Sequence, residues 1–164
     1  MTSMIVRRVL PDEMSAVSAL RETAYRADGL LKANPDYVQA LRDLGTDGRG
    51  EVLVAADGDQ LLGTIMFEPW HDHSELARGA DEAEVRAFAV APQARGRGVG
   101  KLLVEALVER AREEGVSHVL LFTHPEMVSA QYVYRARGFE RFSERDWEPI
   151  PGMRLLAYRL TLKD

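Results

Sequence analysis

The sequence contains no cysteine among its 164 residues. Disulfide bonds, thiolate metal sites and a cysteine nucleophile are therefore excluded. The chain also lacks an apolar run of the roughly 20 residues that a membrane-spanning helix requires. Its opening residues, MTSMIVRR, include no apolar core followed by a small-residue cleavage site, so they do not form a secretory signal. These absences predict a cytoplasmic protein with no membrane segment.

Basic residues are also fewer than acidic residues. Lysine and arginine number 21, against 26 aspartate and glutamate residues, and the formal net charge is −5. This balance argues against nucleic acid as a partner. Hydrophobic residues make up 46% of the chain, which is ordinary for a globular protein. The length suits one domain with its own core, and we expect a single domain over residues 1–164.

Strand and helix patterns are mixed along the chain. Short apolar or alternating runs bounded by turn residues predict strands at 4–9, 52–56, 60–67, 84–91, 118–122, 139–142 and 153–162. Apolar residues at helical spacing predict helices at 11–27, 35–44, 99–114 and 128–137. Residues 143–152, which include Trp147 and Pro149, are expected to form a loop. The strand–helix–strand unit over residues 85–122 predicts an α/β sheet.

The most informative stretch is the run PQARGRGVG, residues 92–100, which lies between an apolar strand and an amphipathic helix. Glycine lacks a Cβ, so backbone N–H groups in such a turn can converge on one anion. The following helix adds unpaired N–H groups and the positive end of its dipole. Arg95 and Arg97 contribute forked donors suited to phosphate. The run therefore predicts a site for a phosphate or pyrophosphate group.

Two familiar phosphate-binding motifs do not fit this run. The mononucleotide motif requires Gly, any four residues, and then Gly-Lys-Ser/Thr. Here Arg95 replaces its first glycine and Leu102 replaces the Ser/Thr. The dinucleotide motif requires a third glycine three residues after the second, where Lys101 stands. A nucleoside triphosphate ligand is disfavoured by these mismatches, although it stays open as an alternative.

The remaining pattern, Gln93-x-x-Gly96-x-Gly98 followed by Gly100, resembles the acyl-CoA pyrophosphate loop of the GNAT family of N-acetyltransferases. Residues 84–92, EVRAFAVAP, are similar to the strand of the family that leads into this loop. A later helix of the family carries the pattern Asn-x-x-Ala-x-x-Leu-Tyr-x-x-x-Gly-Phe. The chain resembles it at Ala130, Val133, Tyr134, Gly138 and Phe139, with Met127 in place of the asparagine.

This resemblance implies a single-domain α/β fold, in which a mixed, mostly antiparallel twisted sheet of about seven strands is flanked by about four helices. Strands 4 and 5 of such a sheet splay apart. Acetyl-CoA is the implied co-substrate, and no metal is implied. Its diphosphate would bind the loop, while its pantetheine arm would pair with the open edge of strand 4. The implied cofactor-binding residues are Phe88, Ala89, Val90, Arg95, Gly96, Arg97, Gly98, Val99, Gly100 and Lys101.

The same resemblance identifies two catalytic candidates. Tyr134 matches the family tyrosine whose hydroxyl lies near the CoA sulfur, where a phenol can protonate the departing thiolate. Glu84 resembles in position the strand glutamate that acts as base in the histone acetyltransferase branch. Such a base needs a pKa raised by burial, or a water relay. The alternatives are a core aromatic ring for Tyr134 and a solvated acid for Glu84, and Tyr132 is expected to point elsewhere.

Other polar residues carry weaker signals. His71-Asp72-His73 places two potential metal ligands on an irregular stretch without a third or fourth, so we expect no metal site. This stretch, residues 69–81, is a better candidate for shaping an acceptor pocket. His118 and His124 are expected to be polar residues at strand ends. The two tryptophans lie in predicted loops, where they either line the acceptor site or pack half-buried.

The resulting hypothesis is an enzyme that transfers an acetyl group from acetyl-CoA to a primary amine directly, in a ternary complex. The absence of cysteine disfavours a covalent route. The alternative is a non-catalytic acyl-CoA-binding sensor or regulatory module. The acceptor, a small-molecule or peptide amine, has no readable signature in the first two helices, residues 69–81 or residues 143–152. Neither nucleic acid nor a membrane is expected as a partner, and the resemblance allows a homodimer.

Overall fold

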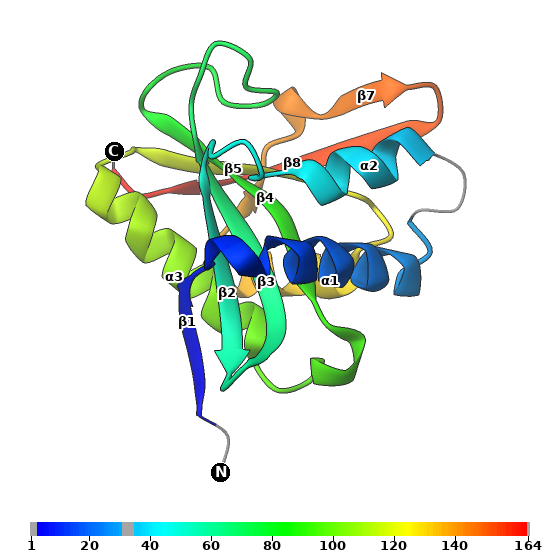
Figure 1. Ribbon diagram of the computed structural model, residues 1–164. Helices are drawn as coiled ribbons and strands as arrows, with labels where there is room; N and C mark the ends of the chain where they lie inside the picture. Colours follow the sequence, from blue (N-terminus) through cyan, green and yellow to red (C-terminus); the bar gives the residue numbers. More distant parts are fainter. Residues whose placement is uncertain (1–2, 31–34, 164) are drawn as a thin grey trace.

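The computed structural model describes residues 3–30 and 35–163. The strands of these residues form one sheet (Figure 1). Its strands are β1 (Met4–Arg8), β2 (Glu51–Asp57), β3 (Gln60–Pro69), β4 (Glu82–Val90), β5 (His118–Thr123), β6 (Glu140–Arg141), β7 (Trp147–Ile150) and β8 (Met153–Thr161). Their order is β1-β2-β3-β4-β5-β8-β6, and β7 pairs with β8. Within these described residues, every pairing is antiparallel except that of β4 with β5. The predicted mixed, mostly antiparallel sheet is confirmed.

Helices cover both faces of the sheet. The α-helices of the described residues are α1 (Met14–Ala27), α2 (Pro35–Asp43), α3 (Val99–Glu114) and α4 (Val128–Arg137), and the short 3-10 helices are η1 (Pro11–Glu13), η2 (Pro92–Ala94) and η3 (Ser143–Arg145). Helices α1 and α2 pack together on one face, where α1 contacts β3 and β4. Helix α3 packs on the other face with α4 (Figure 1). Among these helices, none combines the length and hydropathy of a bilayer-spanning segment.

Helix α3 illustrates how the sequence pattern builds the core. Its buried residues recur at helical spacing: Val99, Leu103, Val104, Leu107, Val108 and Ala111. They pack in the main core between α3 and the sheet. Gly98 and Gly115 flank the helix with φ angles of 79° and 76°, which residues with a Cβ adopt only at a cost. These glycines set the two ends of the helix, and the predicted range 99–114 is confirmed.

The prediction for residues 143–152 is wrong, because this segment contains η3 and the strand β7 rather than only a loop. Strand β7 pairs with β8 at Trp147 with Leu155 and at Ile150 with Met153, and the register is irregular between these two pairs. Pro149 lies in the irregular part. Because proline has no N–H to donate, it confines β7 to a short, interrupted pairing at the sheet margin. The predicted strand 139–142 is likewise reduced to the two residues of β6.

Strands β4 and β5 are paired over only part of their length. Their parallel pairing begins at Glu82 with His118 and ends at Val85 with Leu121, although β4 continues to Val90. Beyond that point the two strands separate, so the predicted splay between strands 4 and 5 is confirmed. The separation leaves one edge of β4 without a neighbouring strand in the middle of the sheet.

A bulge in β4 accompanies this separation. Between the regular pairs on either side, Ile65 of β3 faces both Ala87 and Phe88 of β4. Ala87 has a φ of 49°, the one positive value among the described residues other than glycine. A bulge bends its strand and increases the local twist. The bend therefore turns the end of β4 away from β5 and toward the loop that precedes α3.

Candidate functional site

The loop between β4 and α3 depends on two glycines. Gly96 and Gly98 have φ angles of 82° and 79°. A Cβ at either position would meet no atom within 4 Å. Glycine is therefore needed there for its backbone conformation and not for lack of space. Left-handed residues of this kind turn successive N–H groups toward a common anion.

The N–H groups of residues 96–101 have no acceptor within the part of the chain that the structure describes. The first amide that is bonded into α3 belongs to Leu102, which donates to the carbonyl oxygen of Gly98 at 3.2 Å. Gly98 is the N-cap residue and has no side chain that could accept a hydrogen bond. These adjacent donors lie at the positive end of the helix dipole. The arrangement is that of a site for an anion with several oxygens.

The arginines of this loop are bound to carboxylates of other elements. Arg95 donates through Nη1 and Nη2 to the two carboxylate oxygens of Asp28, at 2.8 and 3.2 Å, just after α1. Arg97 Nη2 lies 3.9 Å from Asp57 Oδ2 at the end of β2. Lys101 is exposed and has no hydrogen bond or ion pair within the described residues. Arg95 thus ties the loop to α1, and the roles of these three cations toward an anion stay predictions.

Phe88 connects the loop to the interior of the protein. A Cβ at Gly100 would lie 3.0 Å from Phe88 Cζ, so this glycine lets the first turn of α3 approach β4 closely. The ring centroids of Phe88 and Tyr134 are 5.5 Å apart. Both rings line the same cavity. The structure therefore brings the glycine loop, the divergent end of β4 and the predicted acid Tyr134 together.

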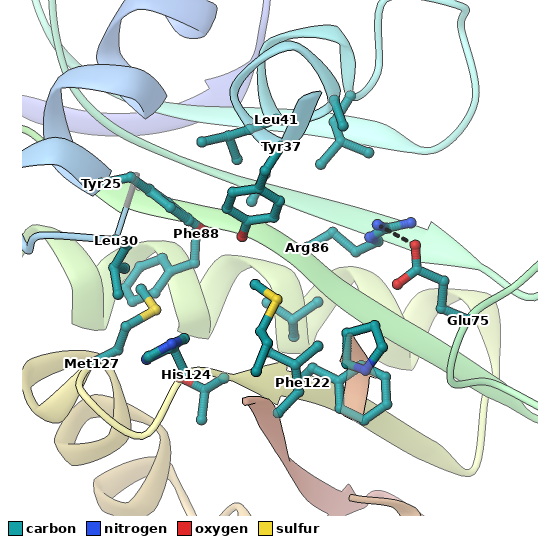
Figure 2. A pocket seen from close by; sticks show the side chains of 18 of the residues that line it. Tyr25, Leu30, Tyr37, Leu41, Glu75, Arg86, Phe88, Phe122, His124 and Met127 are labelled. Carbon is teal, nitrogen blue, oxygen red and sulfur yellow. Dashed lines mark hydrogen bonds and ion pairs between the residues drawn. The ribbon is translucent and has the colours of Figure 1, made fainter. Parts of the chain in front are cut away.

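This cavity has a volume of about 420 Å³ (Figure 2), within the range of small-molecule sites. Its walls come from α1, α2, β4, the end of β5, α4, β7 and β8. Most are apolar and include Tyr25, Leu41, Phe122, Met127, Ile150 and Leu155. Figure 2 shows Leu30 and Phe88 at one end and the pair Arg86–Glu75 at the other. The first two helices and the segment after η3, which are predicted to form an acceptor pocket, both line this cavity.

Tyr134 is buried in the core and also faces the cavity. It is 4% exposed, and its ring contacts Phe139 at a centroid distance of 5.7 Å. Burial raises the pKa of its hydroxyl well above the ordinary value of 10, so the phenol keeps its proton at neutral pH. The hydroxyl makes no hydrogen bond within the described residues. Tyr132 is 76% exposed and, as predicted, points elsewhere.

Glu84 is a buried carboxyl group, so the alternative of a solvated acid is wrong. It is 3% exposed and lines the cavity. Its Oε2 accepts hydrogen bonds from the backbone N–H groups of Leu76 and Ala77, at 3.3 and 3.1 Å. Burial raises the pKa of Glu84 above 4.5, although these N–H groups and Arg86 oppose the shift. The side chain therefore combines a raised pKa with a contact that holds the segment before β4.

A cluster of charged side chains lies at one end of the cavity. Arg86 donates from Nη1 to Glu68 Oε2 at 3.1 Å and from Nη2 to Glu75 Oε1 at 3.2 Å (Figure 2 draws the second contact). Glu68 is 5% exposed, and its Oε1 lies 2.5 Å from His71 Nε2. Burial lowers the pKa of Arg86, but the carboxylates of Glu75, Glu68 and Glu84 outweigh it and raise that pKa. Arg86 therefore stays charged, with its fork shared between two carboxylates.

Among residues 69–81, Glu75 lines the cavity, and the role of this stretch in an acceptor pocket stays a prediction. Within this stretch, His71 contacts Glu68, and its Nδ1 accepts a hydrogen bond from the backbone N–H of His73 at 3.1 Å. No group of three or more potential ligands is placed to hold a metal ion among the described residues. The two tryptophans differ in position: Trp147 lines the cavity, whereas Trp70 is not part of its described lining.

Several cavity residues were not predicted from the sequence. Arg86 is a single charged residue within the apolar run 85–91, and this interruption is the signal that marks it. Tyr25 and Tyr37 lie on helices whose apolar spacing is explained by packing alone, so the pattern does not distinguish them. His124 follows the end of β5 directly, as expected, and also lines the cavity.

Residues 15–139 match the Acetyltransferase (GNAT) family. This match includes strands β2 to β5, the glycine loop, α3 and α4. The chain therefore belongs to the GNAT acetyltransferase family, as the two sequence motifs indicate.

Curated relatives carry acetyltransferase names. The chain is 31% identical over 161 residues to the mycothiol acetyltransferase of Thermobispora bispora, and the alignment covers 94% of this chain and 49% of that protein. It is 32% identical over 88 residues to N-acetyltransferase 8B of Rattus norvegicus, and this alignment covers 54% of this chain and 38% of that protein. The chain thus spans about half, or less, of the length of these relatives.

Solved structures share the fold at low sequence identity. A GNAT-family acetyltransferase of Staphylococcus aureus Mu50 has a TM-score of 0.78 and 17% identity, with 98% of this chain and 100% of that chain covered. A GNAT-family acetyltransferase of Brucella melitensis, solved with acetyl-CoA, has a TM-score of 0.71 and 20% identity, with 100% and 91% covered. An N-acetyltransferase of Thermoplasma acidophilum, solved with coenzyme A, has a TM-score of 0.71 and 14% identity, with 97% and 99% covered. At these identities the likeness concerns the fold alone.

Substitutions of Glu84 test its contact with the preceding segment. Glu84→Ala leaves two buried N–H groups without an acceptor, so we expect the free energy of unfolding to fall by about 1–3 kcal/mol. Glu84→Gln keeps an oxygen acceptor in the same place, and we expect a change below about 1 kcal/mol. Urea denaturation followed by circular dichroism measures both values. Equal losses in the two variants would show that these hydrogen bonds do not hold the segment.

Proposed function

We propose that the chain is an acetyl-CoA-dependent N-acetyltransferase that acts on a primary amine by direct transfer in a ternary complex. The observation that carries this proposal is the row of unpaired N–H groups at residues 96–101, which connects through Phe88 to the cavity. Family membership supports acetyl transfer. The complexes of similar structures with acetyl-CoA and coenzyme A support the co-substrate.

The shape of the site suggests how acetyl-CoA would bind. Residues 96–101 would donate their N–H groups to the diphosphate, and the basic side chains of the loop would add positive charge at its border. The pantetheine arm, which contains amide groups, would pair with the edge of β4 at residues 88–90, where β5 has diverged. The thioester would then lie beside Phe88 and Tyr134. A backbone N–H of the bulged strand would hold the carbonyl oxygen as it becomes negative.

Acetyl transfer in this site requires two protons to leave the acceptor ammonium and one proton to reach the sulfur. Glu84 would accept the proton of the acceptor ammonium, directly or through a water molecule. The free amine nitrogen would attack the thioester carbon, and the C–S bond would break as the amide forms. Tyr134 would give its proton to the departing thiolate, and the second proton that the nitrogen loses as the amide forms would restore the phenol. Burial raises the pKa of the phenol, but the thiolate forms in the same buried place, where its own pKa also rises.

The alternative, a non-catalytic acyl-CoA-binding module, predicts acetyl-CoA binding without thiol release for any amine. Tyr134 in the cavity favours the enzyme. A single domain over residues 1–164 and a cytoplasmic location are parts of the same proposal, and the acceptor is a small-molecule or peptide amine. Calorimetry with acetyl-CoA and a thiol-release assay over a panel of amines distinguish the two functions. Absence of acetyl-CoA binding at saturating concentration would overturn both.

Gly98→Ala tests the role of the loop backbone. A Cβ fits the available space, but a φ of 79° costs a residue with a side chain about 1–3 kcal/mol of strain. Relaxation of this strain moves the N–H groups, so we expect the Kd for acetyl-CoA, measured by calorimetry, to rise at least about tenfold. Gly48→Ala is the matched control, because Gly48 has a φ of 81° and equally open surroundings in a remote turn. An equal change of Kd in both variants would contradict the assignment.

Tyr134→Phe tests the proposed acid. This change keeps the ring and removes a hydroxyl that has no hydrogen bond within the described residues. We expect kcat for thiol release to fall about 10²-fold, with the Kd for acetyl-CoA and the unfolding midpoint unchanged. Tyr132→Phe, on the exposed side of the same helix, should keep the full rate. A wild-type kcat in Tyr134→Phe would exclude the phenol as the proton donor.

The pH profile tests the proposed base, which acts only when it is ionised. Because burial raises the pKa of Glu84 above 4.5, kcat/KM of the wild type should decline already above pH 4.5 as the pH is lowered. In Glu84→Gln this acidic limb should vanish, and kcat/KM at neutral pH should fall about 10²-fold. An alkylamine acceptor ionises near pH 10, and this ionisation affects the pH profiles of the wild type and of Glu84→Gln equally. An unchanged acidic limb in Glu84→Gln would show that another group accepts the proton.

A further inference from the structure

The charged end of the cavity has an excess of negative charge. Among the described lining residues, Arg86 is the one lysine or arginine. It faces Glu75 and Glu84 in the lining and Glu68 directly behind it. Three carboxyl groups are therefore gathered around one guanidinium group, and one of them, Glu68, also contacts His71. An ammonium group is attracted into such a field, and a carboxylate is repelled from it.

Arg86 is also not available to bind a carboxylate on the acceptor. Its two terminal nitrogens already donate to Glu68 and Glu75, at 3.1 and 3.2 Å. An incoming carboxylate would have to displace one of these partners, and the displaced group would then lose its own counter-ion. Displacing Glu68 is especially costly, because its side chain is 6% exposed and its charge would be left buried. The cavity therefore disfavours an acid group beside the reacting amine.

The remaining walls are suited to an apolar body. Leu41 and Phe122 lie between the two ends of the cavity in Figure 2, and Met127 lies beside Leu30 at the end away from Arg86. Ile150 and Leu155 add further apolar surface. Burial of an aromatic or branched aliphatic group against these side chains is favourable, whereas a polar group there loses its hydrogen bonds to water. The body of the acceptor is thus selected by the apolar walls and its amine by the carboxyl groups.

Together, these features point to a small acceptor that carries a primary ammonium on an apolar, preferably aromatic, body and no carboxylate next to the amine. This inference rests on the proposed acetyl transfer and specifies its substrate class. 2-Phenylethylamine is the simplest compound of this kind. Phenylalanine has the same body and amine but adds a carboxylate on the carbon that bears the nitrogen, so it tests the charge argument alone.

The experiment compares kcat/KM, expressed per free amine, for 2-phenylethylamine, phenylalanine, phenylalanine amide and ethylamine. We expect kcat/KM for 2-phenylethylamine to exceed that for phenylalanine at least about tenfold, because the negative cluster repels the carboxylate of phenylalanine. Phenylalanine amide has the bulk of the amino acid without its charge and should recover most of this difference. Ethylamine, which lacks the apolar body, should be at least about tenfold poorer than 2-phenylethylamine. A rate for phenylalanine equal to that of 2-phenylethylamine would overturn the inference.

Glu75→Gln tests whether the charged cluster causes the selection. Its side chain is 43% exposed, so the substitution should leave folding intact, while Arg86 loses the charge of one partner. We expect the preference for 2-phenylethylamine over phenylalanine to shrink at least about threefold. Glu113→Gln, at a 68% exposed position on α3, removes the same charge far from the cavity and should leave the preference unchanged. An unaltered preference in Glu75→Gln would contradict the role of the cluster.

Calorimetry separates failure of this inference from failure of the proposed function. If coenzyme A binds but no amine is acetylated, 2-phenylethylamine is titrated into the protein–coenzyme A complex. Binding that is tighter than that of phenylalanine supports the inference, and absence of binding overturns the substrate class alone. If neither acetyl-CoA nor coenzyme A binds, the proposed acetyl transfer fails, and the inference fails with it.

Discussion

The separation of β4 from β5 is the constraint on which the site depends. A sheet interior normally has no free edge, because each strand satisfies the backbone groups of its neighbours. Here the parallel pairing stops at Val85, and the bulge at Ala87 turns the rest of β4 away. A positive φ at alanine costs free energy, and it persists because Ala87 and Phe88 are buried and β3 pairs with β4 on both sides of the bulge. The interior edge that results is open to an extended ligand with amide groups, while the Phe88 ring reaches both α3 and Tyr134.

The arginines near the site stabilise the scaffold. Arg95 binds Asp28, and Arg86 binds Glu68 and Glu75, so these guanidinium groups join elements that are distant in sequence. The N–H groups of residues 96–101 have no acceptor among the described residues, and their directions are determined by the chain itself. A long side chain loses conformational freedom when it orders on a ligand, whereas an amide in a rigid loop is already in position. The loop therefore combines donors of fixed geometry with charges that hold this geometry.

The sequence predicted those parts of the fold that depend on local pattern. Helices α3 and α4 begin and end as predicted, because apolar spacing defines their buried faces and glycines stop them. Strand β7 was missed because Pro149 interrupts the pattern that an edge strand would otherwise show. The glycine loop was found because residues 96 and 98 adopt backbone conformations that favour glycine. The pair Arg95–Asp28 could not be predicted, since its members are 67 positions apart and meet only when α1 packs beside the loop.

The charged cluster at the end of the cavity could not be predicted for the same reason. Glu68, Glu75 and Arg86 lie on β3, on the segment after it and on β4, and their meeting depends on the register of the bulged pair of strands. A bulge shifts this register by one residue, and such a shift reverses which side chains share a face. Sequence spacing alone therefore does not show which charges come together. The single arginine within an apolar strand indicates only that a buried counter-charge must exist somewhere.

The proposed role of Glu84 as a base and its observed hydrogen bonds to the segment before β4 place opposite demands on one carboxyl group. A base must take up a proton, whereas the anchor of a loop must keep accepting hydrogen bonds. The two oxygens divide these tasks: Oε2 accepts both the Leu76 and the Ala77 amides, and Oε1 has no hydrogen bond within the described residues. A proton that binds to Oε1 leaves the contacts of Oε2 in place. Burial also favours the protonated form, which raises the pKa even though the two amides favour the carboxylate. In the proposed acetyl transfer, the carboxyl group can therefore change its charge while the wall of the cavity that it supports stays where it is.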